Sequence, residues 1–167
     1  MKRKLSKLCI LFLLLGLGTL YAFLHKSEGV SGNEWILAQK AYVGTLADFA
    51  EDLDDVYALY ISGGMDKTTF LTEWEKLSSV YEILSLKKAQ DDKKHPVAPE
   101  GHTKSTKRGA EALEEIQNAF GELLSYSVAD GKPVKRTELL YRHMACSKKI
   151  QEEIDVFMKA YQEAKGR

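Results

Sequence analysis

The chain has 167 residues, with 24 Lys and Arg against 24 Asp and Glu, so its formal net charge is zero. Four of the cations precede residue 8, which leaves 20 against 24 carboxylates, or about −4, for residues 25–167. This balance provides no general attraction to nucleic acid, and we expect no nucleic-acid partner. The length suits one membrane anchor and one domain.

The N-terminus carries the strongest signal in the chain. Residues 8–24 contain no charged side chain, and Leu5 extends the apolar segment to 5–24. A helix over 8–24 would span roughly 25 Å, the short end of what crosses a bilayer core. The basic flank before it favours a cytoplasmic N-terminus and an extracytoplasmic C-terminal domain. The sequence therefore predicts a basic flank and signal-anchor helix over 1–26 and a linker over 27–33.

Cleavage of this segment is the alternative, since a basic flank and an apolar run also describe a signal peptide. The best cut, after Ala22, has Leu20 and Tyr21 where small residues are preferred. A cleaved chain would be secreted, but the poor site favours a retained anchor. The two cysteines, Cys9 and Cys146, provide no disulfide framework, which is typical of a bacterial envelope protein rather than a small eukaryotic secreted module.

Residues 34–167 are expected to form the extracytoplasmic domain, divided by Gly and Pro into segments with helical periodicity. The first, about 33–62 with Asn33 as cap, has a heptad seam at Trp35, Gln39, Tyr42, Leu46, Phe49, Leu53, Val56 and Tyr60. The second, about 66–93 with Asp66 as cap, repeats the spacing at Phe70, Trp74, Leu77, Tyr81 and Leu84.

The third segment, about 106–128, has its stripe at Leu113, Ile116, Phe120 and Leu123. The fourth, about 134–165, has Leu140, His143, Ser147, Ile150, Ile154, Phe157 and Tyr161. Short joints at 63–65 and 129–133 predict antiparallel neighbours, so we expect an all-α, up-down-up-down four-helix bundle with coiled-coil-like packing and no β-structure. Alternatively, the first helix continues the membrane helix, with 29–32 forming only a kink.

An acidic stretch on the first helix is the main candidate for partner binding. Asp48, Glu51, Asp52 and Asp55 follow i, i+3, i+4, i+7 spacing and share one face. Tyr57 is offset from the heptad position at Val56 and is expected to belong to an exposed patch. Aromatic residues crowd the first helical hairpin, so we expect a basic or mixed protein partner there. The four carboxylates alone present metal ligands poorly, and a solvated face is the plain alternative.

A haem- or metal-binding bundle is the alternative function. His143 falls on the seam, and Met65, Met144 and Met158 are available as further ligands; Met65 and His143 are expected at one end of the bundle. His95 and His102 flank a Pro-containing loop without a third ligand, and the basic residues around that loop are candidates for contact with lipid headgroups. We predict no cofactor and no metal as the leading interpretation.

Catalysis has little support. Cys146 follows His143 by three residues, but no oxyanion donor or orienting third group accompanies the pair. The common catalytic and nucleotide-binding motifs are absent from the sequence. The sequence thus predicts a non-enzymatic, single-pass membrane protein whose extracytoplasmic helical bundle binds a partner.

Overall fold

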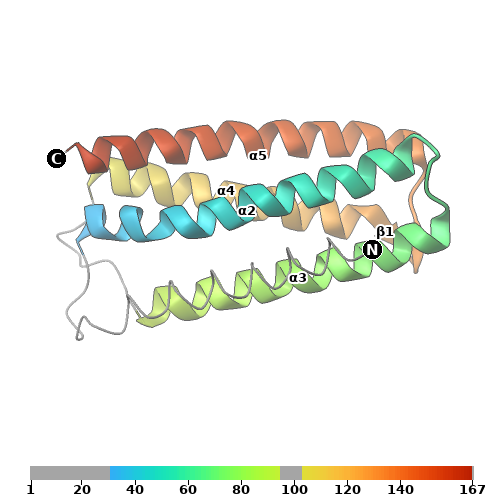
Figure 1. Ribbon diagram of the computed structural model, residues 1–167, viewed down its shortest axis with the longest axis horizontal. Helices are drawn as coiled ribbons and strands as arrows, with labels where there is room; N and C mark the ends of the chain where they lie inside the picture. Colours follow the sequence, from blue (N-terminus) through green and yellow to red (C-terminus); the bar gives the residue numbers. More distant parts are fainter. Residues whose placement is uncertain (1–30, 95–102, 167) are drawn as a thin grey trace, which may run out of the picture.

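A computed structural model describes residues 31–94 and 103–166 of the chain (Figure 1). The predicted anchor over 1–26 and most of the linker lie outside these residues, as do His95 and His102. Within the described residues, no helix is both long and apolar enough to cross a membrane.

The first described helix, α2, covers Gly32–Ile61 and begins with a capping box. The Ser31 hydroxyl accepts a hydrogen bond from the Glu34 amide at 3.3 Å, and the Glu34 carboxylate accepts one from the Ser31 amide at 2.9 Å. These bonds satisfy donors that the first helical turn leaves without partners. The cap therefore lies two residues before Asn33, the predicted position.

The next helix, α3, covers Lys67–Lys94, and Asp66 precedes it as predicted. The Asp66 carboxylate accepts hydrogen bonds from the amides of Thr68 and Thr69 at 2.8 and 2.9 Å. These bonds, with one from the Thr69 hydroxyl, lower the pKa of Asp66 because they stabilise its charged form.

Helix α4 covers Lys104–Ser127 with Thr103 as its N-cap, and α5 covers Arg136–Lys165. Between them lies a small antiparallel hairpin of β1, Val128–Ala129, and β2, Lys132–Pro133. Its turn has Asp130 and Gly131 at φ 50° and 71°, which suits the Asp-Gly pair of a two-residue hairpin loop. The expectation of no β-structure is wrong here.

The described residues are otherwise helical and form a bundle whose helices alternate in direction along the chain (Figure 1). The start of α2 and the end of α5 lie at one end, which we call the proximal end. The α2–α3 turn and the β hairpin lie at the other, the distal end. A continuous core joins all four helices, although α3 contributes only Phe70, Leu77, Leu84 and Lys88 as buried residues.

The predicted stripes agree well with this core, with one local error at the start of α5. Leu46, Phe49, Leu53 and Tyr60 are buried on α2 as expected. On α5, however, Leu140 is 36% exposed and Leu139 is fully buried in its place. A strict heptad pattern counted back from Ile150 selects Leu140. A straight helix has 3.6 residues per turn instead of 3.5, so the position that faces the core is one residue earlier, at Leu139.

Candidate functional site

The four acidic residues of the predicted partner-binding face, Asp48, Glu51, Asp52 and Asp55, are all exposed on α2. Among the described residues, no ion pair involves any of them. The sequence contains no Lys or Arg between positions 41 and 61 that could neutralise them within the helix. This face therefore presents negative charge to solvent.

Tyr57 does not belong to that surface, and the prediction of its exposure is wrong. The side chain is completely buried, and its hydroxyl lies 2.6 Å from the hydroxyl of Ser127 on α4. Burial raises the pKa of Tyr57 because the phenolate would lose its hydration. A bundle helix packs against more than one neighbour, so its apolar face is wider than the narrow seam of a two-stranded coiled coil.

Asp54, which the sequence analysis did not single out, joins α2 to α5. Its carboxylate oxygen Oδ1 lies 2.6 Å from His143 Nε2 and accepts a hydrogen bond from the Ser147 hydroxyl at 2.7 Å. The bond to His143 is the main cause that lowers the pKa of Asp54. The imidazole also stacks on Tyr57, with ring centroids 5.3 Å apart.

This arrangement gives His143, the residue on which the alternative haem or metal site depends, a hydrogen-bond partner in Asp54. Aromatic rings fill the core beside it: Tyr57 packs edge-on against Phe70 at 5.5 Å, and Phe70 stacks on Tyr60 at 4.1 Å. Met65 lies at the same distal end as His143, as predicted, and its carbonyl accepts a hydrogen bond from Arg136 at 2.9 Å. No group of three or more potential His, Cys, Asp or Glu metal ligands occurs in the described part of the chain.

Cys146 is buried, which agrees with its interpretation as a small core residue. Burial, followed by the nearby negative charge of Glu122, raises the pKa of the thiol. A raised pKa lowers the fraction of reactive thiolate. The geometry thus gives Cys146 no activation as a nucleophile.

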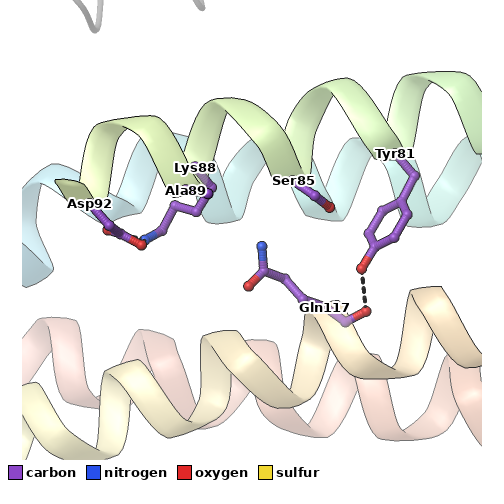
Figure 2. Close-up of a pocket in the computed structure, with 6 residues that line it drawn as sticks. All are labelled: Tyr81, Ser85, Lys88, Ala89, Asp92 and Gln117. Atoms are coloured by element: carbon purple, nitrogen blue, oxygen red, sulfur yellow. Dashed lines mark hydrogen bonds and ion pairs between the residues drawn. The ribbon is translucent and has the colours of Figure 1, made fainter. Parts of the chain in front are cut away.

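A shallow pocket of about 300 Å³ opens between α3 and α4 (Figure 2). It is lined by Tyr81, Ser85, Lys88, Ala89 and Asp92 from α3 and by Gln117 from α4. The side chains of Ser85 and Ala89 are small, so α3 leaves space opposite α4 at this level. The volume is at the lower limit of ordinary small-molecule sites.

The polar groups of this pocket are largely bonded to one another. The Tyr81 hydroxyl donates to the Gln117 carbonyl at 2.5 Å, and the Gln117 amide donates to the Tyr42 hydroxyl at 3.0 Å. Burial raises the pKa of Tyr42 to about 12. Lys88, 7% exposed, pairs with Asp92 and has its ammonium 5.4 Å from the centre of the Trp35 ring. Most polar groups that line the pocket are thus paired, but the buried Ser85 hydroxyl has no hydrogen-bond partner among the described residues.

The basic stretch after the second predicted helix is only partly described. Lys104 and Lys107 are exposed at the start of α4, at the proximal end, while Arg108 pairs with Glu163 of α5 at 3.1 Å. The end of α3 and the start of α4 thus lie at the same end of the bundle, as antiparallel neighbours require (Figure 1).

Comparisons with protein families, with curated proteins and with solved structures return no match for this chain. The functional interpretation therefore depends on the charges, exposures and contacts described above.

Proposed function

We propose that the protein is a non-enzymatic, single-pass membrane protein of the cell envelope, whose extracytoplasmic helical bundle binds a protein partner through the acidic face of α2. The observation that carries this proposal is the exposed row of Asp48, Glu51, Asp52 and Asp55, which has no ion-pair partner among the described residues. A surface whose charges are all of one sign, and are not neutralised by ion pairs, attracts oppositely charged partners and raises their association rate.

The location of this row suits a membrane-anchored binding protein. The uncharged run over 8–24 and its basic flank support an anchor with the N-terminus in the cytoplasm. Helix α2 begins at Gly32, and Asp54 lies 22 residues further along it, which corresponds to roughly 33 Å at about 1.5 Å per residue. An anchored chain would thus present the acidic face well away from its point of attachment.

Site-directed photo-cross-linking in intact membranes tests the proposal. A cross-linker at Asp52 should give a discrete protein adduct that weakens when Asp48, Glu51 and Asp55 are reversed to Lys. A cross-linker at Glu111, exposed on α4, serves as the control position. Equal adducts from both positions, or an adduct insensitive to charge reversal, would show that the acidic face is only a solvated surface.

Fractionation of the full-length protein tests the anchor separately. Retention in the membrane fraction with an intact N-terminus is expected. A soluble chain that begins near Phe23 would instead establish cleavage and secretion.

A further inference from the structure

The distal half of the bundle exposes an unusual group of apolar side chains on α5. Tyr141 is 76% exposed, Met144 is 61% exposed and Leu140 is 36% exposed. They lie within five consecutive residues at the start of α5. Large apolar side chains gathered in one place are a recognised feature of interaction surfaces, whereas isolated ones require no explanation.

Two of these side chains border the acidic helix. Leu140 lies one turn before His143, and Met144 lies one turn before Ser147; His143 and Ser147 both contact Asp54 on α2. Residues three apart on a helix are neighbours, so Leu140 and Met144 follow the edge of α5 that faces α2. By the same spacing, Glu51 lies one turn before Asp54 on α2, and Ala58 lies one turn after it. Glu51 and Ala58 of α2 and Leu140 and Met144 of α5 thus border the α2–α5 contact. The exposed Asp55 and Tyr141 follow Asp54 and Leu140 in the chain and lie further round their helices, towards solvent. We call these six residues the distal patch.

The charged side chains of the distal patch are all acidic. Glu51 and Asp55 have no ion-pair partner among the described residues, and the Asp54 side chain remains 49% exposed despite its two contacts. Arg142 is the only Lys or Arg between residues 137 and 147. It is directed to α4, where it pairs with Glu122 and lies 4.7 Å from the centre of the Tyr126 ring. Lys148, one helical turn after Met144, borders the patch and is exposed, but it pairs with Glu152 of the same helix at 3.6 Å. Both of these cations therefore have carboxylate partners outside the patch.

We propose that the distal patch binds a basic amphipathic helix of a partner protein. Such a helix would place its apolar stripe on Leu140, Met144 and Tyr141 and its Lys or Arg residues beside Glu51, Asp54 and Asp55. The mode is that of an amphipathic helix on an apolar strip, in which the i, i+3, i+4 and i+7 residues serve as anchors. The unbranched Met144 side chain can adapt to different anchors. A second copy of the chain is a poor occupant, because two patches of the same negative charge repel each other.

This inference names the partner class for the acidic face and so depends on the proposed function. It adds that α5 supplies the apolar half of the interface, and that charge alone is not sufficient. Because α5 is not part of the first helical hairpin, the binding surface differs from the one predicted from the sequence.

The test uses full-length protein in nanodiscs of zwitterionic lipid and synthetic 18-residue peptides, with empty nanodiscs as reference. The probe peptide has leucines at i, i+3, i+4 and i+7 and lysines elsewhere. A scrambled peptide of the same composition and a peptide with Glu in place of Lys are the controls. We expect saturable binding of the probe only, with affinity that falls as salt is raised.

Matched variants locate the binding. Tyr141→Ser/Met144→Ser and Glu51→Gln/Asp55→Asn should each weaken the probe at least fivefold. Ile83→Ser/Leu86→Ser on the exposed face of α3 and Glu111→Gln/Glu114→Gln on α4 remove equivalent groups elsewhere and should have no effect. Circular dichroism melting of each variant verifies folding, which these exposed changes should preserve.

The outcomes separate the two proposals. Loss of binding in both distal-patch variants, but in neither control, supports the inference. Binding of the scrambled peptide, equal losses in all variants, or self-association of the protein that depends on Met144 would overturn it. If the photo-cross-link at Asp52 persists in membranes while the probe peptide fails to bind, the acidic face binds a partner of another class. If both fail, the proposed function itself is wrong.

Discussion

The α4–α5 interface and the contact surface of α3 are built from different side chains. Small residues, Ala112 and Ala119 on α4 and Ala160 and Ala164 on α5, are buried in the core, and a methyl group at Gly109 would already contact Ile36 at 3.5 Å and Ala160 at 3.7 Å. In contrast, α3 meets its neighbours through Phe70, Trp74 and Tyr81. Small residues let two helix backbones approach closely, whereas large rings keep them apart.

The polar atoms of long aromatic side chains on α3 reach across to α4. The Trp74 indole donates to the Leu124 carbonyl at 2.9 Å, and the Tyr81 hydroxyl donates to the Gln117 carbonyl at 2.5 Å. Beside the Tyr81–Gln117 bond, towards Asp92, the pocket between α3 and α4 remains open (Figure 2). Thus α2, α4 and α5 form the densely packed part of the molecule, and α3 is held against them by a few long side chains.

Truncation of core leucines should produce the largest effect and reveal this difference. Leu53→Ala on α2, where the side chain is 1% exposed, should reduce the free energy of unfolding by about 2–5 kcal/mol. Leu77→Ala on α3, 9% exposed, should fall at the lower end of that range because its surroundings can relax more easily. Chemical denaturation measures both values. Asp52→Ala, on the exposed face, should remain within about 0.5 kcal/mol, and equal losses in all three variants would refute the core assignment.

Enlargement of small side chains tests the packing directly. Ala160→Leu should destabilise by about 1–3 kcal/mol, because the methyl group is fully buried and a larger side chain would have to displace its neighbours in the core. Ala89→Leu places the same added volume in the pocket and should leave the free energy of unfolding almost unchanged. Comparable destabilisation of the two variants would mean that α3 packs as tightly as α5.

Removal of one phenolic oxygen should have a smaller effect. Tyr81→Phe deletes the hydrogen bond to the Gln117 carbonyl and should cost about 0.5–1.5 kcal/mol. Tyr141→Phe removes the same atom from a side chain that is 76% exposed and should leave the thermal midpoint unchanged. If Tyr81→Phe also has no effect, the polar bridges contribute little to the attachment of α3.

Acid should produce the smallest change, at the α2–α5 contact rather than at α3. The pKa of Asp54 is lowered in the folded state, mainly by His143, so its stabilising contribution is present above the usual carboxyl pKa of about 3.9 and lost as pH falls through the lower, folded value. Partial exposure of the carboxylate screens the effect.

Thermal melts at pH 5 and pH 3 measure this contribution. Asp54→Asn should lose less stability than the wild type between the two pH values, and Ser147→Ala should give an intermediate result because one hydrogen bond remains. Identical pH profiles for all three proteins would show that the Asp54 contacts do not stabilise the folded state.

The sequence by itself determined the helices, their boundaries to within a few residues and most of the buried stripe. These features follow from the 3.6-residue periodicity and from local caps such as Asp66, which require only near neighbours in the chain. The exposed state of the acidic row is also a local property, since four carboxylates on one helix face are too costly to bury without partners. The Asp-Gly pair at 130–131 is a further local signal, because this dipeptide is typical of the two-residue loop of a β hairpin.

Only the tertiary structure decided which residues from different helices meet. The burial of Tyr57 beside Ser127, the contact of Asp54 with His143 and the choice of Leu139 over Leu140 all depend on the rotation of one helix against its neighbours. The same rotation brings the first half of α5 against Asp54 of α2, through His143 and Ser147. A single-helix pattern fixes which side is apolar, but the neighbour at its edge is set by packing of the whole bundle, because ridges of side chains select the arrangement that fills space best.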